Sequence, residues 1–149
     1  MSIWYRLTLA GDIPLRQVAD LAAPHACETT FPPDGGVLTS DLYDECGYLV
    51  SITSGDNGYY DAEDDDGTQW EWEPERYVDI DFDMSKDDRA DGGELNVVTT
   101  VARVLAARPE DAALVLNGNW VLLTRVAGQV RQHRPQWWET YGLGHLVPH

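Results

Sequence analysis

The alternation of apolar and polar residues predicts several strands along the chain. They are expected over residues 3–9, Tyr48–Thr53, Gln69–Glu73 and Tyr77–Asp83. A period of two is typical of a strand that lays one face against a core. In the last of these segments, it turns Val78, Ile80 and Phe82 inward and leaves the aspartates facing outward.

A first helix follows from apolar residues spaced three positions apart. Leu15, Val18 and Leu21 mark a short amphipathic helix that begins near Pro14 and ends near Pro24. Proline is tolerated in a first helical turn and cannot continue a helix, so both ends are indicated by the sequence.

A second helix is predicted after the acidic strand. Its apolar stripe consists of Leu95, Val98, Val101, Ala102 and Leu105. Asp91 and Glu94 form a capping-box pattern at its start, and Arg108-Pro109 ends it. The stripe predicts that Val101 and Leu105 are buried against the neighbouring strand.

A hairpin and several irregular segments complete the pattern. Ala112–Leu116 and Trp120–Arg125 are predicted strands joined through Asn117-Gly118, which suits a two-residue turn. The remaining expectations are a loop at Phe31–Gly36, short strand pieces at Val37–Leu38 and Leu42–Tyr43, an exposed acidic loop at Asp61–Gly67 and a short helix within Arg131–His149. This order predicts a single α+β domain over residues 1–149, a mainly antiparallel sheet with two or three helices packed on one face.

Acidic residues are concentrated in one part of the 149-residue chain. Sixteen of its 26 Asp and Glu residues lie between Asp56 and Glu94, where only Arg76, Lys86 and Arg89 are basic. With a formal net charge of −16 and a pI near 4.3, the protein repels phosphates. Direct binding of nucleic acid or of an anionic membrane is therefore not expected. A basic protein is the favoured partner, because opposite charge accelerates encounter.

Cysteine usage and hydropathy predict a cytoplasmic protein. Cys27 and Cys46 are too few for a disulfide scaffold, and their spacing matches no zinc motif. The N-terminal residues lack the basic start and long apolar run of a signal peptide. No apolar run is long enough to span a membrane.

The acidic region also contains the residues predicted to bind a partner. They are Tyr59, Tyr60, Asp61, Glu63, Asp64, Asp65, Asp66, Trp70, Trp72, Asp79, Asp81 and Asp83. Aromatic residues among polar ones recur at interface hot spots, and aspartates on one strand face repel one another and favour a cationic partner. Two other interpretations of the strand aspartates stay open, a solvated outer face and a metal site.

The acidic loop at residues 61–67 superficially resembles a calcium-binding loop. Aligning Gly67 with the invariant glycine of an EF-hand places Ala62 at the first ligand position, and no flanking helices are predicted. The loop is therefore expected to be solvated, with calcium binding at most adventitious. No metal centre and no other cofactor is predicted.

No catalytic motif is found in the sequence. The histidines are scattered at His25, His133, His145 and His149. No serine stands in a nucleophile elbow, and the glycines form no phosphate-binding loop. His133 lies between Arg131 and Arg134, which indicates only a small basic patch. A binding protein without catalytic residues is predicted.

The order of segments is similar to that of a known family. It comprises a strand at residues 3–9, a helix starting near Pro14, a strand ending in Phe82-Asp83-Met84, a valine-rich helix at residues 97–105 and the hairpin within residues 109–125. Over residues 3–22 and 78–125, this arrangement resembles the Sit-type (swarming-inhibition) immunity proteins of bacterial polymorphic-toxin systems. The resemblance implies a non-enzymatic bacterial protein with a cognate protein toxin as its partner, and it assigns neither the toxin nor an oligomeric state.

The acid content adds an expectation about that toxin. A basic toxin would complement the charge, and a nuclease is the simplest case, because substrate phosphates and these carboxylates compete for the same cations. The alternative from the residues alone is an acidic DNA mimic that inhibits a nucleic-acid-binding protein, such as an anti-restriction factor. Such a mimic also needs carboxylates spaced like phosphates.

Overall fold

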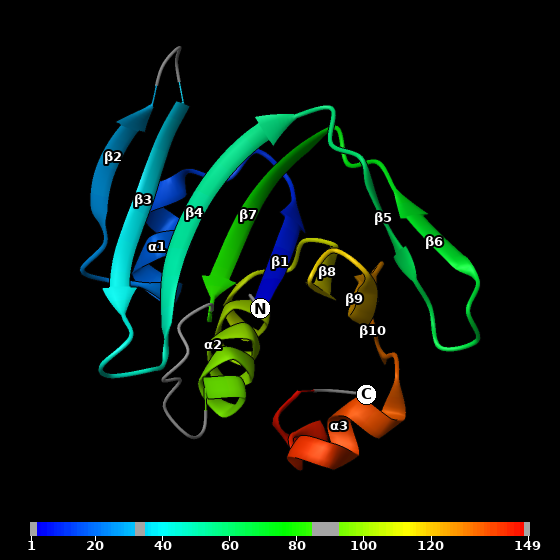
Figure 1. Ribbon diagram of the computed structural model, residues 1–149. Coiled ribbons are helices and arrows are strands. Elements are labelled where there is room, and N and C mark those ends of the chain that lie inside the picture. The colour runs from blue at the N-terminus through cyan, green and yellow to red at the C-terminus, as the bar shows by residue number, and fades with distance from the viewer. Residues whose placement is uncertain (1–2, 32–34, 85–92, 148–149) are drawn as a thin grey trace.

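A mainly antiparallel sheet forms the centre of the fold (Figure 1). The computed structural model describes residues 3–31, 35–84 and 93–147. Its strands are β1 (Trp4–Ala10), β2 (Cys27–Phe31), β3 (Gly35–Leu42), β4 (Tyr48–Asp56), β5 (Tyr60–Glu63), β6 (Gln69–Trp72), β7 (Arg76–Asp83), β8 (Ala112–Leu116), β9 (Trp120–Val126) and β10 (Gln129–Gln132). They are ordered β2-β3-β4-β7-β1-β8-β9-β5-β6, with β10 also paired to β9. Among the described pairs, only β5–β9 is parallel.

The first strand lies in the middle of the sheet. Its predicted alternation is confirmed, because Tyr5, Leu7 and Leu9 are buried on one face. Leu7 lies opposite Ile80 on β7 and opposite Leu114 on β8, both also fully buried. A shift of one residue in either pairing would turn these apolar side chains to the opposite face of the sheet, so their burial fixes the register of β1 with β7 and β8.

Helices cover this apolar face. They are α1 (Leu15–Ala22), α2 (Gly93–Ala107) and α3 (Pro135–Tyr141), followed by a 3-10 turn at Gly144–Leu146. The Tyr5 ring packs edge-on against Trp137 of α3 at 5.9 Å, and its hydroxyl donates to Glu94 of α2 at 3.2 Å. The predicted α+β class is confirmed. In the described part of the chain, no helix is long and apolar enough to cross a membrane.

Most residues of the apolar stripe predicted for the second helix are buried in α2. Val101 and Leu105 are buried as expected, together with Val97 and Val104. Leu95 was expected in the stripe, but it is 46% exposed. At 3.6 residues per turn it lies on the other side of the helix from Val97 and Val104, which face the sheet. The predicted cap residue Asp91 lies outside the described residues.

The segment between α1 and β4 differs from the sequence prediction. The expected strand pieces at Val37–Leu38 and Leu42 are parts of one longer strand, β3, whereas Tyr43 lies in the following turn. Phe31, Gly35 and Gly36, which were expected in a loop, belong to β2 and β3, which form a hairpin, and β3 pairs with β4 from Leu38–Ile52 to Leu42–Tyr48. Residues 32–34 lie outside the described part. β2 and β3 are rich in glycine and threonine and have little apolar alternation, so pairing along the sheet edge decides their conformation.

The C-terminal segment contains one predicted element and one that was missed. A helix was expected within residues 131–149, and α3 confirms it with Trp137 and Trp138 buried. The strand β10 was not predicted. It follows a two-residue turn at Ala127-Gly128, where both residues have positive φ, and it pairs with β9.

The hairpin β5–β6 lies between β4 and β7 in the chain, but in the sheet it lies at the far end, where β5 pairs with β9. Its Tyr60 reaches Asp79 on the face opposite the helices. Figure 1 shows the hairpin at the end of the sheet remote from β2 and α1. Its Ala62 and Trp70 pack with Val115 of β8 and Val121 of β9 in a second small core. Asp61 and Glu63 were expected in an exposed loop, but they belong to β5.

Candidate functional site

The three strand aspartates share the face opposite the helices, but they differ in exposure. Asp79 was expected to face solvent, yet it is only 6% exposed. Thr8, directly opposite on β1, donates a hydrogen bond to its carboxylate, and the Tyr60 hydroxyl of β5 donates at 2.9 Å. The outward strand position was therefore predicted correctly, but the hairpin covers it.

The burial of Asp79 also affects the pKa of its carboxyl. Burial raises the pKa of its carboxyl, against the hydrogen bonds from Thr8 and Tyr60 and the nearby Arg6 cation, which lower it. Burial and the adjacent carboxylate also raise the pKa of Tyr60, so its hydroxyl stays protonated and donates. Asp79 is therefore committed to contacts inside the protein and is not a free surface charge.

Asp81 and Asp83 border an open hollow on the same face. The Arg6 Nε donates to Asp81 Oδ1 at 2.6 Å, while its guanidinium lies 5.0 Å from the centre of the Trp4 ring. Trp4, Arg6, Leu49, Ser51, Asp81 and Asp83 line a volume of about 370 Å³. This hollow contains both signs of charge, so it is less acidic than the strand sequence indicated.

The exposed face of the β5–β6 hairpin carries acidic side chains at opposed positions. Asp61 lies directly opposite Glu71, and both are exposed. The Gln69 side chain donates to Asp61 at 2.9 Å, and the Tyr59 hydroxyl donates to Glu71 at 2.9 Å, which raises the pKa of the tyrosine. Like charges at opposite positions destabilise a strand pair, so this face favours a cationic partner.

The aromatic residues of the same hairpin turn the other way. Tyr60, Trp70 and Trp72 are half-buried and stack along its inner face, with ring centroids 6.0 Å apart for Tyr60–Trp72 and 6.1 Å for Trp70–Trp72. Of the predicted aromatic residues, only Tyr59, 56% exposed, lies on the acidic face. The inner three hold the hairpin against the sheet.

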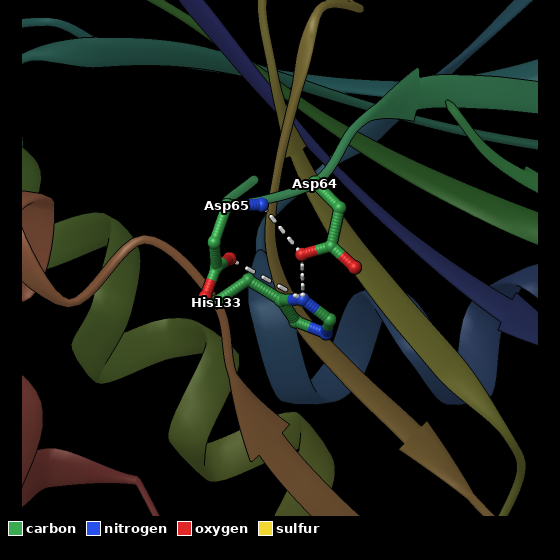
Figure 2. Close-up of side chains that lie close together, drawn as sticks. All are labelled: Asp64, Asp65 and His133. Carbon is green, nitrogen blue, oxygen red and sulfur yellow. Dashed lines mark hydrogen bonds and ion pairs between the residues drawn. The ribbon is translucent and has the colours of Figure 1, made fainter. Parts of the chain in front are cut away.

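A buried histidine attaches the turn of the hairpin to the sheet (Figure 2). His133, 3% exposed, contacts Asp64 Oδ1 through Nδ1 at 2.7 Å and Thr124 of β9 through Nε2 at 2.9 Å. Of the small basic patch expected around Arg131, His133 and Arg134, the Arg131 side chain is exposed, but the His133 ring is enclosed and adds nothing to the surface. Burial acts to raise the pKa of Asp64, but hydrogen bonds from His133 and Asp65 outweigh it and lower this pKa to about 2.

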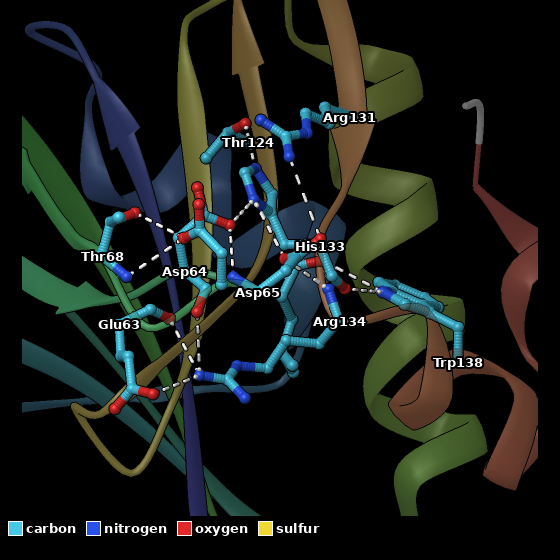
Figure 3. A network of polar contacts seen from close by, with 11 residues as sticks. Glu63, Asp64, Asp65, Thr68, Thr124, Arg131, His133, Arg134 and Trp138 are labelled. Atoms are coloured by element: carbon cyan, nitrogen blue, oxygen red, sulfur yellow. Dashed lines mark hydrogen bonds and ion pairs between the residues drawn. The ribbon is translucent and has the colours of Figure 1, made fainter.

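The following residues extend the same network (Figure 3). Asp65 Oδ1 accepts the backbone N–H of Arg134 at 2.7 Å, and the Arg134 guanidinium donates to the carbonyl oxygens of Glu63 and Asp64 at 3.3 and 3.2 Å. Trp138 Nε1 donates to the His133 carbonyl at 2.9 Å. The turn of the hairpin is thereby joined to β9 and α3.

Metal binding was weighed for this acidic segment. Asp64, Asp65 and His133 have ligand atoms within 4.8 Å of one another. Both ring nitrogens of His133 already contact protein oxygens, and Asp66 accepts hydrogen bonds from the backbone and hydroxyl of Thr68. These side chains form an internal hydrogen-bonded network, and a cation would have to displace its contacts.

The sequence did not predict the contact between Arg134 and Trp120. The Arg134 guanidinium lies over the Trp120 ring, 4.0 Å from its centre. The two residues are 14 positions apart, and the contact depends on the unpredicted β10. The only local signals were a tryptophan beside a tight turn and an arginine before a proline.

Comparison with known proteins gives one match. A family model described as SitI3-like matches residues 3–142. The match therefore includes residues 28–76, beyond the two segments that indicated a resemblance in the sequence. No curated protein and no solved structure matches the chain.

Proposed function

Because the chain belongs to the SitI3-like family of Sit-type immunity proteins, we propose that it protects a bacterial cell by binding and neutralising one cognate toxin. The protein acts in the cytoplasm as a single domain, by stoichiometric binding and not by catalysis. The toxin is basic at its contact surface, and a nuclease is the simplest such toxin. The family match over nearly the whole chain is the observation that carries this proposal.

The acidic face of the β5–β6 hairpin supports a basic partner. Asp61 and Glu71 are exposed and opposed, and within the described residues neither has a basic side chain within 4.0 Å. By contrast, Asp79 and Asp64 are committed to internal contacts. The hairpin face is therefore the best surface for the partner, and the strand face contributes mainly through the rim of its hollow.

The proposal is tested with the toxin encoded beside the gene. Co-expression of this protein should restore growth of cells that produce the toxin. Titration of the purified toxin should reach full inhibition at a fixed molar ratio. Inactivation of many toxin equivalents by a trace amount would show catalysis and contradict the proposal. Protection only against a DNA-binding restriction enzyme would favour the DNA-mimic alternative.

A further inference from the structure

A cavity of about 600 Å³ lies where the start of β9 meets α3. Trp120, Arg134, Trp137 and Tyr141 contribute to its wall, and Asp65 from the turn of the hairpin lies at its border. Trp120 is 41% exposed and Tyr141 is 45% exposed. The cavity thus presents aromatic surface to solvent beside the acidic hairpin.

Arg134 is held in an unfavourable conformation at this cavity. Its backbone is left-handed, with φ 55° and ψ 66°, although it is not glycine and precedes Pro135, and both features disfavour that region. Among the described residues, its buried Nε has no hydrogen-bond partner. Strained backbone and unsatisfied buried donors cluster at functional sites, where surrounding contacts maintain them.

The surrounding contacts that maintain Arg134 come from the hairpin turn. Asp65 accepts its backbone N–H, and the carbonyls of Glu63 and Asp64 accept from its guanidinium. The result is a guanidinium fixed over one face of Trp120, 4.0 Å from the ring centre. Tryptophan, tyrosine and arginine dominate interface hot spots, above all where a rigid pocket excludes water.

We propose that this cavity is the hot spot of the toxin interface and receives an aromatic or long aliphatic side chain from a basic segment of the toxin. The apolar side chain would contact Trp120 and Tyr141. Glu63 and Asp65 already pair with Arg134 and Arg131, so basic residues of the same toxin segment would meet Asp61 and Glu71 on the acidic face of the hairpin. An apolar centre with a charged rim is the usual arrangement of a specific interface. The inference rests on the proposed function and adds the place and chemistry of the contact.

Two substitutions test the cavity from opposite walls. The probe is the toxin encoded beside the gene, and its Kd is measured by calorimetry. Trp120→Ala and Tyr141→Ala should each weaken binding by about tenfold or more. Tyr141 is on α3 and outside the hydrogen bonds of the hairpin turn, so its variant remains informative if loss of Trp120 loosens Arg134. Circular dichroism verifies the fold of each variant.

The matched control is Val126→Ser. Val126 is 59% exposed and lies at the other end of the same strand as Trp120, so its substitution should leave the Kd unchanged. Wild-type affinity in both cavity variants would overturn the inference while leaving the proposed function intact. Failure of the wild-type protein to bind the toxin would overturn the proposed function and this inference with it. A wild-type dimer that Trp120→Ala dissociates without loss of toxin binding would assign the cavity to a second copy and overturn the inference.

Discussion

At the scale of single residues, Asp79 joins three strands. Its carboxylate accepts from Thr8 on β1 and Tyr60 on β5 while belonging to β7. The Arg6 Nε lies 3.9 Å away. A buried carboxylate is stable only when such donors replace water. The residue that the sequence placed on a binding face therefore acts first in positioning the hairpin.

Replacing this carboxylate should weaken the fold. Asp79→Asn exchanges an acceptor oxygen for a donor that faces the donating Thr8 and Tyr60 hydroxyls, so we expect a loss of about 1–3 kcal/mol in the free energy of unfolding. Urea unfolding measures it. The control is Asp61→Asn, an exposed position opposite Glu71, which should stay within about 0.5 kcal/mol of the wild type or stabilise slightly. Equal stability of the two variants would contradict the internal role of Asp79.

The lowered pKa of Asp64 predicts that its contribution to the free energy of unfolding is lost in acid. Its pKa is lowered from 3.8 to about 2 in the folded protein, so the folded state binds fewer protons than the unfolded state. Its contribution is therefore fully present above about pH 4 and is lost as pH falls towards 2, and solvent screening limits it to the order of 1 kcal/mol.

This contribution is measured against Asp64→Asn, which lacks the titrating group. The stability difference between wild type and variant is measured first at about pH 5, where the Asp64 carboxylate is ionised, and then at lower pH. It should shrink between about pH 4 and pH 2 as the wild-type carboxylate takes up a proton. A difference that does not change across that lower window would show that the His133 contact does not stabilise the ionised carboxylate.

At the scale of elements, the helices and strands that could be predicted are those whose signal lies in neighbouring residues of the sequence. Apolar alternation between neighbouring residues predicted the strands at residues 3–9 and 77–83. The local turn signal of Asn117-Gly118 predicted the hairpin around it. The β2–β3 hairpin and β10 were missed because partner strands distant in sequence satisfy their backbone groups.

The site shows the same limit. The outward positions of Asp79 and Asp81 followed from the period of two, but their surroundings depend on where the β5–β6 hairpin folds back. The pairing of Glu63 with Trp120 and the contact of Asp64 with His133 each join residues more than 50 positions apart. No local pattern indicates such contacts, so the cavity at Arg134 was not foreseeable.

The second helix offers a matched pair of core and surface leucines. Leu105→Ala removes a side chain that is 6% exposed in the main core, and we expect it to lower the free energy of unfolding by about 2–5 kcal/mol. Leu95→Ala, on the same helix at 46% exposure, should change stability by less than about 0.5 kcal/mol. Chemical denaturation of both variants measures the difference, and similar losses would mean that the helix face is misassigned.

At the scale of the whole molecule, the net charge is −16, and the carboxylates fall into two groups. Some carboxylates are paired within the fold, such as Asp81 with Arg6 and Glu110 with Arg108. Those on the outer face of the β5–β6 hairpin are exposed and lie beside the aromatic cavity. The two proposals together assign the molecule a long-range attraction for a basic toxin and a short-range apolar contact at one end of the sheet.

These two components should separate in binding kinetics. Attraction between distant charges accelerates encounter and is screened by salt, whereas dissociation depends on contacts already made. We expect the association rate for the toxin to fall steeply between low and physiological salt, while the dissociation rate changes much less. Stopped-flow measurements at several salt concentrations give both rates.

The position of the attracting charge is tested by removing two carboxylates at a time. Asp61→Asn with Glu71→Gln should slow association and flatten its salt dependence, because the hairpin face would lose its two opposed charges. Asp20→Asn with Asp44→Asn removes the same net charge near α1 and the β3–β4 connection, remote from the hairpin (Figure 1). This control should change association only slightly, because β3 and the hairpin lie at opposite ends of the sheet and salt at physiological concentration screens charges beyond about 8 Å. Equal slowing by both double variants would show that net charge alone steers the toxin, and salt-independent association of the wild type would remove the electrostatic argument for a basic partner.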